Sequence, residues 1–301
     1  MTTYQDLQAR LDRGELIILD GATGTELQRR GVPMHGFAWS AAALDTHPEM
    51  VRAVHEDYIR VGADVIIANT YSTAPHVLEP AGLGDRVRAL NQSAVDLAKA
   101  AREHAAAGRG VAVAGSISSF RTRVTPSDRL EGSYREQAQV LAEAGVDLIV
   151  LEMMGSPEQA APAIRAAVAT GLPIWVGVSC LLGDDGVVRF FDGGPFSTGL
   201  TEDLALLADV PAGDVAVLVM HTLTKHTAPA LEIVRQQWSG PTGAYAHSGT
   251  WVDPEWRFDH QISPEDYLGA AQQWVDMGVR IVGGCCAIGP EYIRLLKERL
   301  S

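Results

Sequence analysis

Two adjacent cysteines, Cys285 and Cys286, lie near the end of the chain in the stretch VRIVGGCCAIGP. Successive side chains of a regular strand point to opposite faces, so both thiols can reach one ion only where the backbone has left the strand. Gly283 and Gly284 before the pair, and AIGP after it, favour such a departure. Thiolates are good zinc ligands, and the metal would need one further protein ligand. The alternative is two small apolar residues packed beneath a loop, and the pair alone does not decide between them.

Two acidic residues, Asp20 and Glu152, end apolar runs elsewhere in the sequence. Burying a carboxylate without a partner is unfavourable and shifts it toward its neutral form. Each acid could simply cap the next helix or bind loop amides. If both face one opening, they favour a site for a cationic group such as a substrate ammonium.

The elements that must position these residues repeat along the chain, each a short β-branched apolar run followed by a longer stretch with helical spacing. Eight such runs occur, at residues 15–21, 63–71, 110–117, 146–154, 173–180, 214–221, 241–249 and 279–286. They are continuous rather than alternating, which is typical of parallel strands covered on both faces. We therefore expect a single-domain α/β fold over residues 1–301, the (β/α)8 TIM barrel. In that fold the carboxyl ends of all eight strands meet at one mouth, where the chemistry takes place.

Helix signals follow most of these runs. HPEMVRAVHEDYIRVG places Pro48 in a first turn, and SPEDYLGAAQQWVDMG opens on Ser–Pro–Glu and ends at Gly278. His55 and Glu56 in the first of these helices are expected to face solvent. A doubly wound open sheet is the alternative fold, but GATGTE after the first run lacks both the dinucleotide fingerprint and the lysine of a phosphate loop.

Composition limits the class of protein. The chain has 301 residues, of which 47% are hydrophobic and 20% charged, as in ordinary globular proteins. Its three cysteines argue against a disulfide framework and favour reduced thiols in the cytoplasm. The net charge of −13 is dispersed, which argues against a nucleic-acid partner. No basic-then-apolar leader and no apolar run of about 18 residues is present, so no membrane partner is expected. Association into a homo-oligomer is left open.

The ordered set of motifs resembles the homocysteine S-methyltransferase family. It comprises LDGATGTELQRRG, HEDYIRVGADVIIANTYST, GSI, AEAGVDLIVLE and GGCC, and it covers nearly the whole chain. The resemblance implies a zinc-dependent barrel in which three protein sulfurs hold the metal and the substrate thiol takes the fourth position. It also implies that Asp20 and Glu152 engage the amino group of homocysteine, with backbone amides near Gly21 and Ser116 as partners of its carboxylate.

The sequence departs from the family at the end of the sixth run. Family members usually have Asn–Cys there, which provides the first zinc ligand, but this chain has Met–His. Because Cys₂His is a known set for catalytic zinc, we predict that His221 ligates zinc together with Cys285 and Cys286. The competing account is that the metal has been lost. His247 replaces the family's usual asparagine on the next run, which suggests a coordinated change in the substrate pocket.

Other residues near the predicted mouth carry weaker signals. Cys180 ends the fifth run, where the family has no ligand, and is expected to be a packed small residue. Aromatic residues follow the fifth and seventh runs, namely Phe190, Phe191, Phe196, Trp251 and Trp256. We expect a hairpin after the fifth run whose phenylalanines cover the mouth. The two tryptophans either pack in the ordinary way or contact an onium methyl donor through cation–π attraction.

Three functions are consistent with these residues. The leading prediction is a thiol S-methyltransferase that uses homocysteine or a related thiol and a small onium donor. S-methylmethionine is the first choice, because the chain has no room beyond the barrel for a cobalamin module or a folate barrel. The second is a zinc enzyme of another class, a demethylase, lyase or hydrolase with a metal-activated water. The third is a barrel that binds metal or a small ligand without catalysis. The sequence does not identify the donor or the acceptor.

Overall fold

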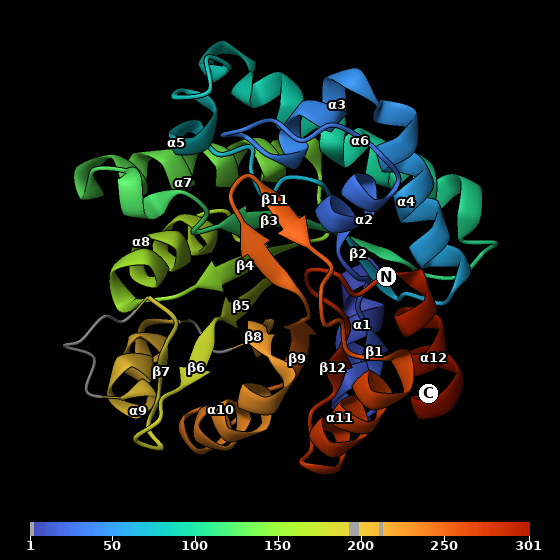
Figure 1. Ribbon diagram of the computed structural model, residues 1–301, viewed down its shortest axis with the longest axis vertical. Coiled ribbons are helices and arrows are strands. Elements are labelled where there is room, and N and C mark those ends of the chain that lie inside the picture. The colour runs from blue at the N-terminus through green and yellow to red at the C-terminus, as the bar shows by residue number, and fades with distance from the viewer. Residues whose placement is uncertain (1–2, 193–198, 211–212) are drawn as a thin grey trace.

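The structure is a computed structural model that describes residues 3–192, 199–210 and 213–301. Its central sheet has eight strands: β1 (Ile17–Ile18), β2 (Val65–Ile67), β3 (Ala112–Ser118), β4 (Leu148–Met154), β5 (Ile174–Val178), β8 (Val215–Leu223), β9 (Thr242–His247) and β12 (Ile281–Val282). They are neighbours in the order β1-β12-β9-β8-β5-β4-β3-β2, and every pair is parallel. A parallel bridge between Leu19 and Val65 joins β1 to β2 and closes the sheet (Figure 1). The predicted barrel is confirmed, and the open sheet is wrong.

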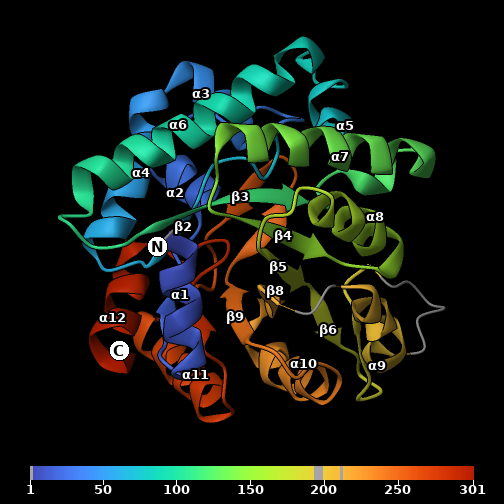
Figure 2. The same cartoon turned by 180° about the vertical axis from the view of Figure 1, so that it is seen from behind.

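Both faces of the barrel strands are buried, as the continuous apolar runs predicted. Ile17 and Leu19 pack inside the barrel, whereas Ile18 between them packs outward against the helices. Helix α1 (Thr3–Asp12) adds Tyr4 and Leu7 to the inner cluster. It therefore covers the amino-terminal end of the barrel, and it lies in front of the strands in Figure 2.

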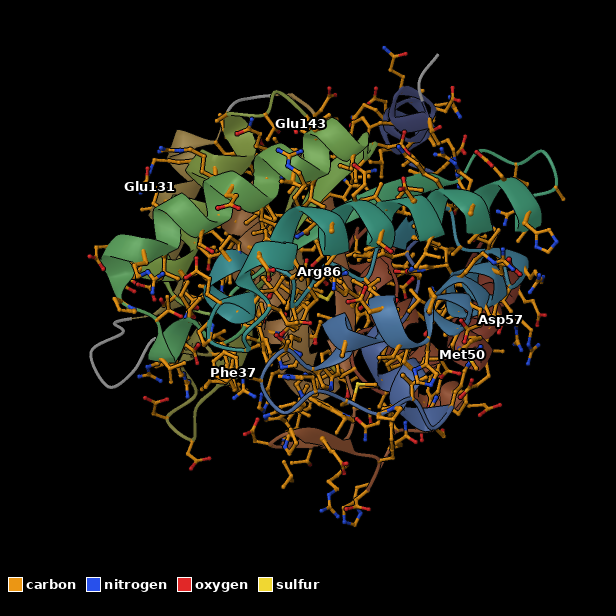
Figure 3. The ribbon with its side chains drawn as sticks, turned by 90° about the horizontal axis from the view of Figure 1, so that it is seen from above. Phe37, Met50, Asp57, Arg86, Glu131 and Glu143 are labelled. Carbon is orange, nitrogen blue, oxygen red and sulfur yellow. The ribbon has the colours of Figure 1, made fainter. Side chains whose placement is uncertain are left out.

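The outer ring consists of α2 (Thr23–Arg29), α4 (Pro48–Arg60), α6 (Val87–Ala105), α7 (Ser127–Ala144), α8 (Pro157–Val168), α10 (Thr224–Gln237), α11 (Pro264–Asp276) and α12 (Pro290–Leu300). Shorter helices are α3 (Ala43–Thr46), α5 (Pro75–Leu78) and α9 (Leu200–Asp203). Figure 3 looks onto α4, α6 and α7, where charged side chains such as Glu131 and Glu143 point outward. None of the helices in the described part of the chain is long and apolar enough to cross a bilayer.

The capping residues predicted two helix boundaries correctly. Pro48 is the first residue of α4, and the Ser263 side chain at the start of α11 accepts a hydrogen bond from the Asp266 amide. The expectation that His55 and Glu56 face solvent is wrong. His55 is fully buried and Glu56 is 6% exposed, because α4 packs against α2, α6 and α12 as well as the barrel.

Two hairpins interrupt the βα alternation at the mouth. The hairpin of β6 (Cys180–Leu182) and β7 (Val188–Phe190) confirms the one predicted after the fifth run. The hairpin of β10 (Thr250–Val252) and β11 (Glu255–Arg257) follows β9 and was not predicted. It lies in front of the barrel strands in Figure 1 and brings two tryptophans over the mouth.

Candidate metal and substrate site

A bulge at the end of β8 places His221 at the mouth. The register between β8 and β9 shifts between Met220 and Leu223, and His221 has a φ of 44°. Bulges re-aim side chains, and a non-glycine residue in this left-handed region costs about 1–3 kcal/mol. The imidazole is half-buried, and loss of solvation, with His247 as a second cause, lowers its pKa well below the usual value. It is therefore neutral at pH 7, and a ring nitrogen has a lone pair for a metal.

Cys285 and Cys286 lie beyond β12, so the backbone has left the strand at the pair, as predicted. Neither Gly283 nor Gly284 has a positive φ. Glycine is needed at Gly284 because of close packing, since a Cβ there would lie 2.2 Å from the Ile288 side chain. Hydrogen bonding with Cys286 and burial raise the pKa of the Cys285 thiol well above its usual value. Only a cation beside the pair would hold both as thiolates.

The three predicted metal ligands come together. Their ligand atoms all lie within 4.8 Å of one another. His221 Nδ1 is 3.5 Å from Cys285 Sγ and 3.8 Å from Cys286 Sγ, and the two sulfurs are 3.8 Å apart. Tetrahedral zinc, with bonds of about 2.3 Å to sulfur and about 2.0–2.1 Å to nitrogen, requires about 3.8 Å between sulfurs and about 3.6 Å between nitrogen and sulfur. The donor set therefore fits a zinc ion in both chemistry and spacing.

Two buried carboxylates belong to the same site. Glu152 in β4 is 7% exposed and accepts hydrogen bonds from the hydroxyls of Ser116 and Tyr245. Burial raises its pKa to about 7, although these hydrogen bonds oppose the shift. Asp20, after β1, accepts a hydrogen bond of 2.8 Å from the Ile67 amide on Oδ2, while its buried Oδ1 has no partner among the described residues. Burial, followed by the charge of Glu152, raises the pKa of Asp20 well above its usual value.

The two other predicted substrate-binding residues have different surroundings. Gly21 lines the cavity described below, beside Glu152. The Ser116 amide already donates to Thr70 Oγ1 at 2.8 Å, so it is not available for a substrate carboxylate. Ser116 instead contributes its hydroxyl, which holds the Glu152 carboxylate in place.

The ligand cluster lies between two cavities. The inner one is lined by Gly21, Ala22, Thr23, Gly24, Trp39, Ser40, Ile67, Ala68, Asn69, Tyr71, Glu152, His221, Gly284, Cys285 and Cys286. The outer one shares Trp39, Tyr71, His221 and Cys286 with it. The Glu152 carboxylate lines the inner cavity, whereas aromatic rings, two arginines and Asp192 line the outer one. Two substrates, one bound in each cavity, would therefore come together at the ligand cluster.

Sequence reasoning missed two of the shared residues, Trp39 and Tyr71. Tyr71 donates a hydrogen bond of 3.0 Å to Met153 Sδ, and its place in NTYST at the end of the second run was an available signal. Trp39 comes from a loop between α2 and α3 and carries no such signal. Its ring lies against Gly24, where a Cβ would be 2.4 Å from the ring.

The aromatic residues predicted near the mouth divide into two groups. Trp251, Trp256 and Phe191 line the outer cavity, and the Phe191 ring stands edge-on to His221 with centroids 6.3 Å apart. The expectation that Phe190 covers the mouth is wrong. It is 1% exposed, because alternate residues of β7 point to opposite sides and Phe190 points into the core. Phe196 lies outside the described residues.

Cys180 lies apart from the ligand cluster, whereas His247 lies beside it. Cys180 is 2% exposed in the apolar core, as predicted, and is not part of the ligand cluster. The His247 ring lies beside His221, with centroids 4.6 Å apart, and its Nδ1 is buried without a partner among the described residues. Burial lowers the pKa of His247 to about 4. The two histidines that replace the family's usual residues, His221 and His247, are thus in contact, and both are neutral near pH 7.

Comparison with known proteins gives consistent matches. The family described as homocysteine S-methyltransferase matches residues 17–300. The homocysteine S-methyltransferase of Escherichia coli (strain K12) is 31% identical, over 99% of this chain and 100% of that protein. The selenocysteine Se-methyltransferase of Brassica oleracea var. italica is 27% identical, over 99% of this chain and 93% of that protein. The metallated form of the Escherichia coli homocysteine methyltransferase MmuM aligns with a TM-score of 0.81 at 28% identity, covering 97% of this chain and 99% of that one.

Proposed function

Because the chain belongs to the homocysteine S-methyltransferase family and is a thiol methyltransferase, we propose that it methylates homocysteine or a related thiol from a small onium donor. S-methylmethionine is the donor we propose first, and zinc is the proposed metal. The observation that carries this proposal is the cluster of His221, Cys285 and Cys286, spaced for a tetrahedral ion between two cavities. Family membership argues against the alternatives of a demethylase, lyase or hydrolase and of a non-catalytic barrel.

The inner cavity suits the amino-acid part of the thiol substrate. Glu152 lines this cavity, and Asp20, whose Oδ1 has no partner among the described residues, is near enough for the charge of Glu152 to raise its pKa. A substrate ammonium would give both carboxylates the charged partner that they lack, and would thereby lower their raised pKa values. The backbone at Gly21 lines the same cavity and is proposed to face the substrate carboxylate.

Thiol methylation needs an ionised thiol and a donor held in line with it. A zinc ion bound by His221, Cys285 and Cys286 would supply a positive centre that keeps the substrate thiol deprotonated near neutral pH. Trp39 and Tyr71 belong to both cavities, so they position a thiol on one side and a donor on the other. Their rings also exclude water from the path between the two substrates. Such orientation supplies a large part of the rate advantage of enzymes that join two substrates.

Metal analysis and a methyl-transfer assay on single variants test the proposal. His221→Ala should reduce zinc affinity by about 100-fold or more, because this change removes a direct ligand, whereas loss of an outer partner typically costs about 10- to 100-fold. His221→Cys should retain zinc and raise activity toward homocysteine, because it restores a third thiolate. Cys180→Ala, which lies outside the cluster, is the matched control and should keep both the zinc affinity and the methyl-transfer activity of the wild type.

Three results would each contradict a different part of the proposed function. Full zinc occupancy in His221→Ala would show that another residue is the third ligand. A wild-type protein that methylates thiols with no bound metal would remove zinc from the mechanism. A protein with bound zinc that methylates no thiol from any onium donor would contradict the proposed substrates.

A further inference from the structure

The outer cavity contains an arginine that thiol methylation alone does not explain. Arg121, after β3, lines this cavity, and its guanidinium lies between the rings of Phe37 and Phe120, with Cζ 4.8 Å and 4.9 Å from the centroids. Its Nη2 donates to the Gly36 carbonyl at 3.0 Å and to Asp253 Oδ1 at 2.7 Å. Its Nε is buried and has no partner within the described residues. The stacking holds the guanidinium in one plane with a donor still free.

The charges on the cavity wall do not cancel. Among the described residues that line it, the charged ones are Arg121, Arg123 and Asp192. Arg123 forms an ion pair with Asp192, whose second oxygen accepts a hydrogen bond of 3.1 Å from Gln159 Nε2. Arg121 forms its ion pair with Asp253, whose side chain is 56% exposed and does not line the cavity. Arg121 is therefore a lining cation whose acidic partner lies outside the cavity wall and is open to solvent, so a ligand carboxylate can compete with that partner.

A bare onium ion would meet opposing forces in this cavity. The rings of Trp39, Tyr71 and Trp251 would attract it through cation–π interaction, whereas Arg121 would repel it. A molecule with a cation at one end and a carboxylate at the other would satisfy both features. Trp39 and Tyr71 also line the inner cavity with the ligand cluster, so the cationic end belongs near the cluster and the carboxylate at Arg121.

We propose, on the basis of the function proposed above, that the outer cavity binds a sulfonium or quaternary ammonium carboxylate and that Arg121 holds the carboxylate of this methyl donor. Arginine suits this role because its planar fork can give two parallel hydrogen bonds to a carboxylate. The carboxylate then fixes which end of the donor enters first. The onium methyl group is presented toward His221 and Cys286, where the thiol is to be methylated.

Calorimetric titration without any thiol tests this inference separately from methyl transfer. The probes are S-methylmethionine and dimethylsulfoniopropionate, which carry a carboxylate, and trimethylsulfonium, which does not. Arg121→Gln should weaken binding of the first two by about 10- to 100-fold, as for loss of a hydrogen bond between charged groups, and should leave trimethylsulfonium binding unchanged or tighter. Arg129→Gln, on α7 and ion-paired with Glu79 away from the cavity, is the matched control and should change none of the three.

Asp253→Asn separates binding from a structural role of Arg121. If Arg121 binds the carboxylate of the donor, removing the competing carboxylate of Asp253 should leave binding of the two carboxylate probes unchanged or make it tighter. If Arg121 only fixes its loop, Arg121→Gln and Asp253→Asn should both weaken all three probes alike, which would overturn the inference. A wild-type protein that methylates no thiol but shows the Arg121-dependent binding pattern would refute the proposed function and leave this inference standing.

Discussion

Glu152 is the residue for which the site makes its sharpest binding prediction. Glu152→Gln keeps the shape of the side chain but removes its charge, so homocysteine binding should weaken by about 10- to 100-fold, as expected for a hydrogen bond between charged groups. Zinc content should remain stoichiometric, because two thiolates and an imidazole already supply the protein ligands. The KM for homocysteine and the zinc content, measured on one preparation, check both statements. Loss of zinc would contradict the assignment of Glu152 to the ammonium.

The pKa of Glu152 also predicts how folding stability depends on pH. Burial raises this pKa from 4.5 to about 7, so the folded protein binds more protons than the unfolded chain between these values. The free energy of unfolding should therefore fall as the pH rises from 4.5 to 7, by up to about 3 kcal/mol at about 1.4 kcal/mol per pKa unit. Asp20, whose pKa is also raised, adds an effect of the same sign.

Glu152→Gln carries no charge to bury, so the metal-free variant should be more stable than the metal-free wild type at pH 8, by up to about 3 kcal/mol. At pH 5 the advantage should be much smaller, because most of the wild-type carboxyl is then protonated in the folded state. Urea denaturation at the two pH values measures the difference. If the variant and the wild type differ equally in their free energy of unfolding at pH 5 and at pH 8, packing rather than ionisation distinguishes the two proteins.

At the scale of elements, the segments that follow β1 and β12 approach each other so closely that glycine is required at position 21. A Cβ on Gly21 would lie 2.2 Å from the Ile288 carbonyl oxygen. Gly21→Ala should therefore lower the free energy of unfolding by about 1–3 kcal/mol, as overpacking generally does, and should weaken zinc binding by moving the segment that carries Cys285 and Cys286. Gly110→Ala, whose Cβ would meet nothing within 4 Å, is the control for chemical denaturation and zinc titration. Equal stability of the two variants would contradict this account.

The elements that could be predicted are those with a strong local pattern. Continuous apolar runs identified all eight barrel strands, and Pro48 and Ser263 located two helix starts. The hairpin β10–β11 was missed because its strands have three residues each and Pro254 lies between them. The left-handed backbone at Met153 and His221, which sets the geometry of the mouth, leaves no mark in the sequence, since neither residue is glycine.

At the scale of the whole molecule, barrel closure brings distant parts of the chain to one site. Because all strand ends meet at the mouth, and because the family resemblance places a ligand at position 221, the association of His221 with Cys285 and Cys286 could be predicted without a structure. The division into an inner and an outer cavity could not. It depends on Trp39, from an irregular loop, and on the β10–β11 hairpin that carries Trp251 and Trp256, and neither follows from periodicity.

Closure also links metal binding to the stability of the entire fold, because the ligands come from β8 and from the segment after β12. An ion that binds only the folded state stabilises it by about 4 kcal/mol at 1,000 times its Kd. Chelation should therefore lower the Tm of the wild type by about 5–10 °C, given shifts of about 2–4 °C per kcal/mol in domains of about 150–250 residues and smaller ones above that size. Scanning calorimetry with and without chelator measures this shift.

Two cysteine variants make that measurement decisive. Cys286→Ala should melt at the lower temperature and show no response to zinc or chelator, because it has lost a ligand. Cys180→Ala removes a buried thiol outside the cluster, so it should melt somewhat lower than the wild type yet keep the full response to zinc. If the wild type itself melts at the same temperature with zinc and with chelator, the cluster holds no metal. His221, Cys285 and Cys286 would then be joined only by the hydrogen bonds among their own side chains.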